Sequence, residues 1–278
     1  MTTVGETLDR IEHCYDAIPR VNGARVEEFG PLVLFLHGIG GNRSNWRDQL
    51  PALAQHFQAM AWDARGYGDS DDYAGPLHTR DFCHDLLRVL DHFEAETAHL
   101  VGLSMGGSII QDFYAYHPQR VASMVLADTR PGFEAAFDPA ARQEFLRLRL
   151  EPLLQGKEPA DIAPAVARSL MGREASEDVY QRLVDSMRAL HKASYIKAIE
   201  ARGSWQPVFV PAAVTVPTLV LVGADDRLTP PSLAKSIADA IPGAQLSVIA
   251  SAGHLSNIEQ PAVFNRLLLE FLREVAGV

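Results

Sequence analysis

The sequence predicts an α/β protein with a mostly parallel, twisted sheet and helices on both faces. Short unbroken apolar runs, such as Leu32–Leu36, are typical of parallel strands that are buried on both faces. These runs alternate with longer segments of helical periodicity, which is the order expected of βαβ units. The stretch 130–217 interrupts the alternation, since it carries helical patterns and no buried-strand run before residue 208. We therefore expect a helical cap to be inserted into the sheet-forming part of the chain.

The predicted elements follow one another in a regular order. Strands are predicted at 32–36, 57–62, 98–103, 121–127, 218–222 and 245–249. Helices are predicted at about 46–56, 79–93, 107–117, 231–241 and 262–275. The fourth of these helices has a good start, because Thr229 is a favourable cap and Pro230 suits a first helical position. Before the first buried run, the pattern predicts a short amphipathic helix over residues 5–18 and a short strand within 21–29.

The 278 residues are enough for one large α/β domain. We expect residues 1–129 and 218–278 to form the core, with 1–20 as an N-terminal extension of helical pattern, and 130–217 to form the cap. A cap over the carboxyl ends of the strands would lie where the active sites of such sheets are found, and it would exclude water from a pocket there. The alternative for this stretch is a separate small helical domain.

The composition excludes several classes of protein. A net charge of −10 argues against a nucleic-acid partner and against an anionic membrane surface, because both attract basic patches. Two cysteines, Cys14 and Cys83, do not make a disulfide framework. The N-terminus lacks a secretory signal pattern, and no apolar run approaches the roughly 20 residues of a membrane span. We expect a cytoplasmic protein with a small-molecule partner, no nucleic-acid partner and no membrane partner. Assembly into a homo-oligomer is a further hypothesis.

The stretch Gly102-Leu103-Ser104-Met105-Gly106-Gly107 stands where a predicted strand meets a predicted helix. A G-x-S-x-G pattern in this context indicates a nucleophile elbow, a strained turn that exposes the serine hydroxyl at the edge of the sheet. Small neighbours are needed because a side chain there would strike the adjoining strand and helix. The alternative is an ordinary serine at the start of a helix. We favour Ser104 as a nucleophile because three later segments agree with it.

A serine nucleophile needs a base, and the base needs an acid to orient it. His254 follows the last predicted strand and would lie at the same sheet edge as Ser104. For the acid we favour Asp226, which follows the strand 218–222, with Asp225 and then Asp128 as alternatives. The order serine, aspartate, histidine along the chain is that of α/β-hydrolase triads.

The glycine-rich loop His37-Gly38-Ile39-Gly40-Gly41 follows the first buried strand. Acyl transfer creates a negative oxygen, which two backbone amides usually stabilise. We assign this oxyanion hole to the amides of Ile39 and Met105. His37 is interpreted as a brace for the loop, with a second base as the alternative.

Taken together, these motifs resemble those of the α/β-hydrolase superfamily. The resemblance rests on His37-Gly38, Trp46, Asp63-x-Arg65-Gly66-Tyr67-Gly68-x-Ser70, Gly102-x-Ser104-x-Gly106-Gly107, Gly223-x-x-Asp226-x-x-x-Pro230 and Gly253-His254. It spans roughly residues 30–275 and implies the α/β-hydrolase fold, with the helical cap inserted after the sixth strand of that fold, here 121–127. The sequence resembles the 3-oxoadipate enol-lactonase and small carboxylesterase branch of this superfamily at 252–261, Phe264-Asn265 and Ser194-Tyr195.

One segment departs from that branch. Such lactonases often carry a serine- or asparagine-rich loop where this chain has 37–41, and the glycine-rich form is shared with esterases and with carbon–carbon bond hydrolases. Five side chains are candidates to line an acyl pocket: Trp46, Phe133, Tyr195, Trp205 and Leu255. For the four aromatic residues, the alternative is packing in the core or cap. Because no metal or dinucleotide motif is present, we expect no cofactor and no metal.

The expected activity is hydrolysis of a small carboxylic ester or lactone, with an enol-lactone as the specific hypothesis. Two other activities that use the same three catalytic residues are alternatives. One is hydrolysis of a carbon–carbon bond in aromatic ring-cleavage products, and the other is that of a cofactor-free perhydrolase. A hypothesis outside enzymology is a receptor-like protein that keeps the fold and the pocket to bind a ligand. Naming a substrate from the fold alone is an analogy.

Overall fold

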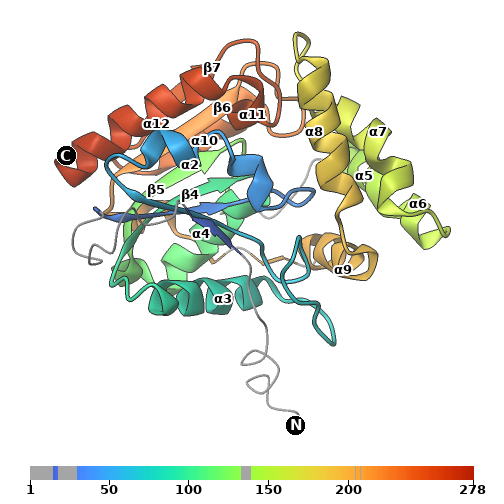
Figure 1. Ribbon diagram of the computed structural model, residues 1–278, viewed down its shortest axis with the longest axis horizontal. Coiled ribbons are helices and arrows are strands. Elements are labelled where there is room, and N and C mark those ends of the chain that lie inside the picture. The colour runs from blue at the N-terminus through green and yellow to red at the C-terminus, as the bar shows by residue number, and fades with distance from the viewer. Residues whose placement is uncertain (1–14, 18–29, 133–138, 204, 207) are drawn as a thin grey trace.

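The computed structural model of the protein describes residues 15–17, 30–132, 139–203, 205–206 and 208–278 (Figure 1). In these ranges the strands form one sheet of seven, in the order β1-β3-β2-β4-β5-β6-β7. All neighbours from β3 to β7 pair in parallel, and only β1 pairs antiparallel, with β3, at the edge. The predicted α/β class with a mostly parallel sheet is confirmed.

The strand positions agree closely with the apolar runs of the sequence. The strands are β1 (Tyr15–Ala17), β2 (Leu32–Leu36), β3 (Gln58–Trp62), β4 (Ala98–Leu103), β5 (Val121–Ala127), β6 (Thr218–Gly223) and β7 (Gln245–Ile249). Every residue of β2, β4 and β6 is buried, which explains why these strands are apolar on both faces. The edge strand β7 differs, because most of its residues are exposed or only partly buried.

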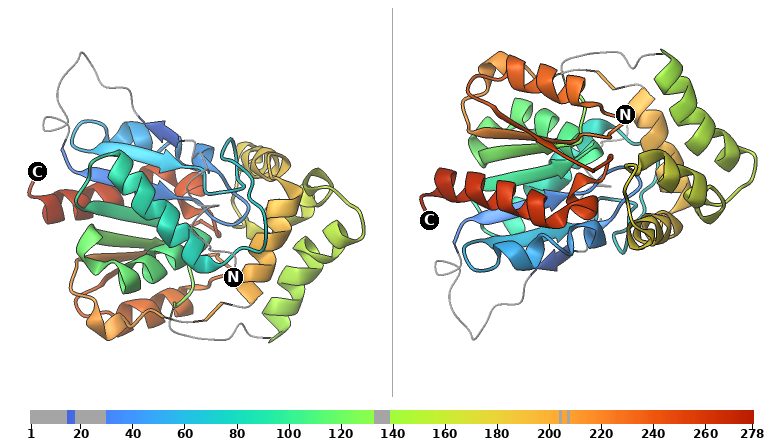
Figure 2. Two further views of the ribbon diagram at one scale, coloured as in Figure 1. Left: turned by 90° about the horizontal axis from the view of Figure 1, so that it is seen from below. Right: turned by 90° about the horizontal axis from the view of Figure 1, so that it is seen from above.

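Helices cover both faces of the sheet (Figures 1 and 2). On one face lie α3 (Thr79–His92) and α4 (Met105–Tyr116), and on the other lie α2 (Leu50–Leu53) and α12 (Pro261–Ala276). Further elements are α10 (Pro231–Ala240), which packs against β6 and β7, α11 (Ser256–Glu259), and short 3-10 helices at Arg43–Trp46, Pro118–Arg120 and Pro211–Ala213.

The segment between β5 and β6 is helical, as expected. It contains α5 (Pro139–Arg149), α6 (Glu151–Leu154), α7 (Pro159–Leu170), α8 (Glu177–Arg188) and α9 (Lys192–Gly203). These helices lie together at one end of the sheet, and α7 packs on both α5 and α8 (Figure 2). Hereafter these five helices and the loops that join them are called the cap.

Two sequence predictions need correction. Residues 15–17, expected to be helical, form the strand β1, because the otherwise open edge of β3 offers backbone hydrogen bonds to them. The rest of that predicted helix and the predicted strand within 21–29 lie outside the described residues. The predicted helix 46–56 is divided into a 3-10 helix at Arg43–Trp46 and the single turn of α2. Pro51 explains the division, because it lacks the N–H that a continuous helix needs, whereas in the first turn of α2 no such hydrogen bond is required.

Candidate active site

Ser104 stands at a strained turn between β4 and α4. Its φ of 53° lies in the left-handed region, where residues other than glycine are uncommon. A Cβ added at Gly102 would collide with the backbone of Gly106, and one added at Gly106 would collide with the backbone of Leu36. The glycines of the G-x-S-x-G motif are therefore required by close backbone approach. The serine lies at the N-terminus of a twelve-residue helix, where the free amides and the helix dipole favour negative charge.

His254 and Asp226 meet in the loops that follow β7 and β6. The Nδ1 atom of His254 lies 2.8 Å from Oδ2 of Asp226. Asp226 is further held by the backbone N–H groups of Leu228 and Thr229, at 2.8 and 2.9 Å, and by the Thr229 hydroxyl, which donates a bond of 2.6 Å. These contacts hold the carboxylate in one orientation against the imidazole ring.

The electrostatics of this pair favour an ionised aspartate. Burial alone would raise the pKa of Asp226, but His254 and the hydrogen bonds from Thr229 outweigh it and lower that pKa to about 2. Burial opposes protonation of His254, but the Asp226 carboxylate raises the pKa of His254 above its usual 6.5. The ring is therefore a stronger base than a free histidine.

The other two candidate acids face elsewhere. The Asp225 carboxylate contacts the backbone N–H and the guanidinium of Arg173 in the loop between α7 and α8. Asp128 is buried and accepts hydrogen bonds from the backbone N–H of Gly223 and from the N–H and hydroxyl of Ser256. Burial and the nearby Asp226 charge raise the pKa of Asp128 to about 7. Among the three aspartates, Asp226 alone is hydrogen-bonded to His254 in the part of the chain described.

The glycine-rich loop lies against Ser104. Gly38 approaches the serine closely, since an added Cβ there would lie 3.3 Å from the Cβ of Ser104. Ile39 lines the cavity next to Ser104, whereas the Met105 side chain is buried and does not line it. Among the described residues, no hydrogen bond from the Ile39 or Met105 amide to a neighbouring residue is observed. Both amides are therefore available to a ligand.

His37 sits behind this loop. Its Nε2 accepts a hydrogen bond from the backbone N–H of Ala64 at 3.1 Å, and its Nδ1 lies 2.8 Å from the carbonyl oxygen of Gly38. Burial lowers the pKa of His37. A neutral ring with Nδ1–H fits both contacts and leaves neither nitrogen free for a substrate, so the geometry fits a brace for the loop.

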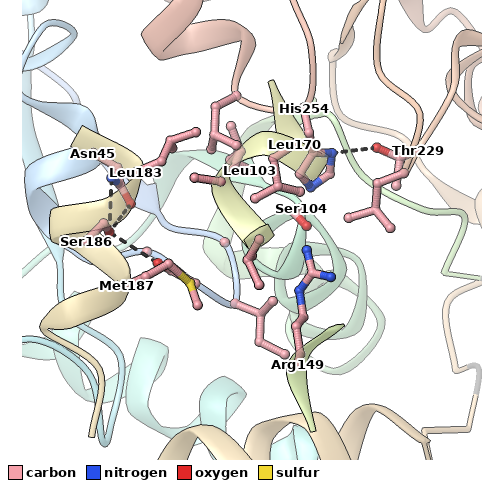
Figure 3. A pocket seen from close by; sticks show the side chains of 18 of the residues that line it. Asn45, Leu103, Ser104, Arg149, Leu170, Leu183, Ser186, Met187, Thr229 and His254 are labelled. Carbon is pink, nitrogen blue, oxygen red and sulfur yellow. Dashed lines mark hydrogen bonds between the residues drawn. The ribbon is translucent and has the colours of Figure 1, made fainter. Parts of the chain in front are cut away.

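A cavity connects these groups (Figure 3). Its empty volume is about 690 Å³, which includes the open space at its mouth. It is lined by core residues that include Ser104, Thr229, His254 and Leu255, and by cap residues from α5, α7, α8 and α9. The hydroxyl of Ser104 and the ring of His254 face each other in it.

Of the four predicted lining residues that the structure describes, only Leu255 lines this cavity. Trp46 is fully buried in the core, where it packs on Phe35 and Phe264, and Tyr195 is fully buried within the cap. Trp205 instead donates a hydrogen bond from Nε1 to Asp112. Packing inside the protein, the alternative for the aromatic candidates, is confirmed for Trp46 and Tyr195, because large rings are stabilised by burial. Phe133 lies outside the described residues.

Three further residues of the site were not foreseen. Thr229 bonds the aspartate, Ser186 of α8 donates a hydrogen bond to the carbonyl oxygen of Gly40, and Arg149 of α5 lines the cavity. Thr229 was considered only as a helix cap. Ser186 and Arg149 belong to helices whose packing on the core no local pattern reveals.

The described residues contain neither a metal-binding cluster nor a membrane-spanning helix. No group of three or more histidine, cysteine, aspartate or glutamate residues is arranged there to hold a metal ion. In the same ranges no helix is both long and apolar enough to cross a membrane.

The parallel sheet, the strained serine between β4 and α4, and the inserted helices define the class of α/β-hydrolase-fold proteins. The family described as "alpha/beta hydrolase fold" matches residues 31–261, and the chain belongs to this family.

Known proteins similar to the chain include several hydrolases. A "2-hydroxy-6-oxononadienedioate/2-hydroxy-6-oxononatrienedioate hydrolase" of Cupriavidus pinatubonensis is 29% identical, covering 96% of this chain and 92% of the relative. The "3-oxoadipate enol-lactonase 2" of Acinetobacter baylyi is 26% identical, with 84% and 86% covered. An esterase of Thermogutta terrifontis has a similar structure, with a TM-score of 0.84, 26% identity, and 96% and 94% covered. The resemblance to the α/β-hydrolase superfamily is confirmed, and hydrolase activity is supported.

Proposed function

We propose that the protein is a serine hydrolase of small carboxylic esters or lactones, with Ser104, His254 and Asp226 as its catalytic residues. The observation that carries the proposal is that a strained serine lines the same cavity as a buried histidine that is hydrogen-bonded to a carboxylate. Serine is a poor nucleophile without such a base, and a base of raised pKa accepts its proton more readily.

The reaction proceeds through an acyl-enzyme. Oγ of Ser104 attacks the carbonyl carbon while Nε2 of His254 takes the hydroxyl proton, and Asp226 stabilises the imidazolium through Nδ1. The amides of Ile39 and Met105 bind the oxyanion. The carbon–oxygen bond of the ester then breaks, and His254 returns the proton to the leaving oxygen. In the second half, His254 takes a proton from water, and the resulting hydroxide attacks the acyl carbon. The bond between that carbon and Oγ of Ser104 then breaks, and His254 returns the proton to Ser104 as the acid is released.

The domain boundaries belong to the same proposal. Residues 130–217 act as a cap that narrows access to the cavity, while 1–129 and 218–278 form the core that carries the catalytic residues. The supporting observation is that side chains from four cap helices line the cavity opposite Ser104. A lid of this kind excludes water and shapes the pocket.

An enol-lactone is the specific substrate that we propose. Its support is the similarity to the "3-oxoadipate enol-lactonase 2" of Acinetobacter baylyi. The second candidate is hydrolysis of a carbon–carbon bond in an aromatic ring-cleavage product, which the similarity to the Cupriavidus hydrolase over 96% of the chain favours. A panel of enol-lactones and vinylogous diketones separates these two, because each enzyme would leave the other's substrate intact.

The class of reaction is tested by initial rates on p-nitrophenyl acetate and butyrate. We expect turnover by the wild type and loss of at least about 10³-fold in Ser104→Ala. Ser108→Ala, in the same helix, is the matched control and should retain the wild-type rate. Equal rates in the wild type and Ser104→Ala would exclude a serine mechanism, and such a result would favour a ligand-binding protein.

A further inference from the structure

A buried cation forms part of the cavity wall opposite the serine. Arg149 is the last residue of α5, and only 3% of it is exposed. It lines the same cavity as Ser104, and in Figure 3 its guanidinium group points toward the Ser104 hydroxyl. Arginine is almost never so buried unless it is paired.

No carboxylate accounts for this burial. The guanidinium carbon of Arg149 lies 4.5 Å from the centre of the Phe145 ring, which holds its plane. The Tyr195 hydroxyl interacts with Arg149 but does not reach hydrogen-bond geometry with any described residue. Within the described residues Arg149 forms no ion pair, and the neighbouring Glu144 is exposed and bonded to Arg147. Burial lowers the pKa of Arg149, as expected of a charge that is costly to bury.

The surroundings add positive charge. Arg130, which follows β5, and Arg202 of α9 line the same cavity, and no described lining residue is an aspartate or glutamate. Burial, and then the charges of Arg130 and Arg149, lower the pKa of Arg202 to about 10. A cavity with this lining is unusual in a chain whose net charge is −10. The positively charged lining is therefore confined to this site and does not reflect the charge of the whole chain.

We propose that Arg149 binds a carboxylate of the substrate, so that the preferred substrate is an ester or lactone that carries a second, ionised carboxyl group. This rests on the proposed function. Because the guanidinium faces the Ser104 hydroxyl, the carboxylate lies only a few bonds from the reacting carbonyl. A planar guanidinium matches a carboxylate with two parallel hydrogen bonds. The bound anion would also supply a countercharge to the buried Arg149 guanidinium.

The first test compares esters that differ only in this charge. Monomethyl succinate is matched with methyl butyrate, and monomethyl glutarate with methyl valerate, and hydrolysis is followed by pH-stat. We expect the wild type to prefer the anionic member of each pair. In Arg149→Met the ratio of anionic to neutral kcat/KM should fall by about 10- to 100-fold. Arg149→Lys should restore part of the preference.

Arg147→Met is the matched control. Arg147 lies in the same helix but is exposed and bonded to Glu144, so its loss should leave the ratio unchanged. A ratio equally reduced in both variants would show a general effect of helix charge and overturn the proposal.

The second test measures binding without turnover. Calorimetric titration of Ser104→Ala with succinate, glutarate and inorganic phosphate should show binding of a dicarboxylate that the double variant with Arg149→Met loses. Binding of phosphate alone would overturn the assignment to carboxylates. The thermal midpoint of Arg149→Met should not fall below that of the wild type, because no described carboxylate loses its partner. A clear fall in that midpoint would instead assign Arg149 a structural role.

The two proposals fail in different ways. Neutral esters that are hydrolysed as fast as anionic ones would leave the serine hydrolase standing and overturn the carboxylate site. Absence of any hydrolysis, together with Arg149-dependent binding of a dicarboxylate, would overturn the proposed function and support the anion site.

Discussion

At the residue scale, three aspartates near the site differ in what their carboxylates contact. Asp226 meets His254, Asp225 meets Arg173 of the cap, and Asp128 joins the end of β6 to the start of α11. Asp128 therefore holds together the two loops that carry Asp226 and His254. Its raised pKa of about 7 follows from burial beside the charged Asp226. These contacts fit Asp226 as the acid that orients His254 and Asp128 as a positioning residue.

Asp226→Asn should lower kcat by about 10³- to 10⁴-fold. The amide cannot balance the imidazolium, and it does not select the tautomer that leaves Nε2 free to accept the serine proton. Initial rates on p-nitrophenyl butyrate measure the effect. Asp225→Asn is the control, since it changes an adjacent carboxylate that faces Arg173, and it should retain the wild-type rate. Equal losses in the two variants would contradict the assignment of the acid.

The sequence was informative about the site wherever backbone geometry demanded a particular residue. Gly102 and Gly106 are required by close backbone approach, so a motif in the correct order predicted which loops meet. The residues that line the pocket were predicted less well. Trp46 and Tyr195 were candidates because they are aromatic, yet both are fully buried away from the cavity. Arg149 carries no local signal, because its place depends on how α5 packs over the core.

At the scale of elements, Asp112 links the core to the segment that follows the cap. This residue of α4 is 3% exposed, and its Oδ2 accepts a hydrogen bond of 2.9 Å from Trp205 Nε1. Its other carboxylate oxygen has no partner in the described part of the chain. Burial raises the pKa of Asp112 from 3.8 to about 6, against the opposing effect of the Trp205 bond. A raised carboxyl pKa means that ionisation at neutral pH destabilises the folded state.

Asp112→Asn should therefore stabilise the protein at neutral pH. The folded pKa exceeds the unfolded one, so the favourable contribution of Asp112 is complete below pH 3.8 and is lost as the pH rises through about 6. The neutral amide can still accept the Trp205 hydrogen bond. We expect the free energy of unfolding in urea to rise by up to about 3 kcal/mol at pH 8, with little gain at the acid end. Asp239→Asn, at an exposed site bonded to Lys235, is the control. A gain of equal size at both pH values would contradict the titration of Asp112.

Strand positions followed from the sequence because each buried parallel strand is a short, continuous apolar run. Helix boundaries depend more on single residues, and the predicted helix 46–56 was wrong because Pro51 lies in the first turn of a separate short helix. The strand β1 could not be foreseen, because three residues contain no usable period and their strand pairing depends on the exposed edge of β3.

At the scale of the whole molecule, the cap is joined to the core at the site itself. The backbone N–H of His254 donates a hydrogen bond of 2.8 Å to the carbonyl oxygen of Leu170 at the end of α7. Glu259 accepts one from Gly172, and Arg182 of α8 pairs with Asp48 at 2.7 Å. A Cβ added at Gly253 would collide with the backbone of this cap segment. Cap and catalytic loop are thus fitted to each other at the level of the backbone.

We expect the protein to unfold in a single calorimetric transition, because the cap and the core share these contacts. Gly253→Ala should lower the midpoint of that transition and reduce the free energy of unfolding by about 1–3 kcal/mol, since the cap backbone must move away. Gly243→Ala is not a suitable control, because its φ of 73° strains any side chain. Ala240→Gly, at the end of α10 away from the cap, serves to show the background effect of a small substitution. Two separate transitions in the wild type would contradict a jointly folded cap.

The central claim is that Ser104 is a nucleophile activated by His254, and covalent labelling with a fluorophosphonate tests it most directly. The reagent is attacked by an activated serine and needs no knowledge of the natural substrate. Intact-mass measurement should show one adduct on the wild type, and peptide mapping should place it on Ser104. The adduct should be absent in Ser104→Ala and form far more slowly in His254→Ala. Absence of labelling on the folded wild type, or an adduct that persists in Ser104→Ala, would contradict the account.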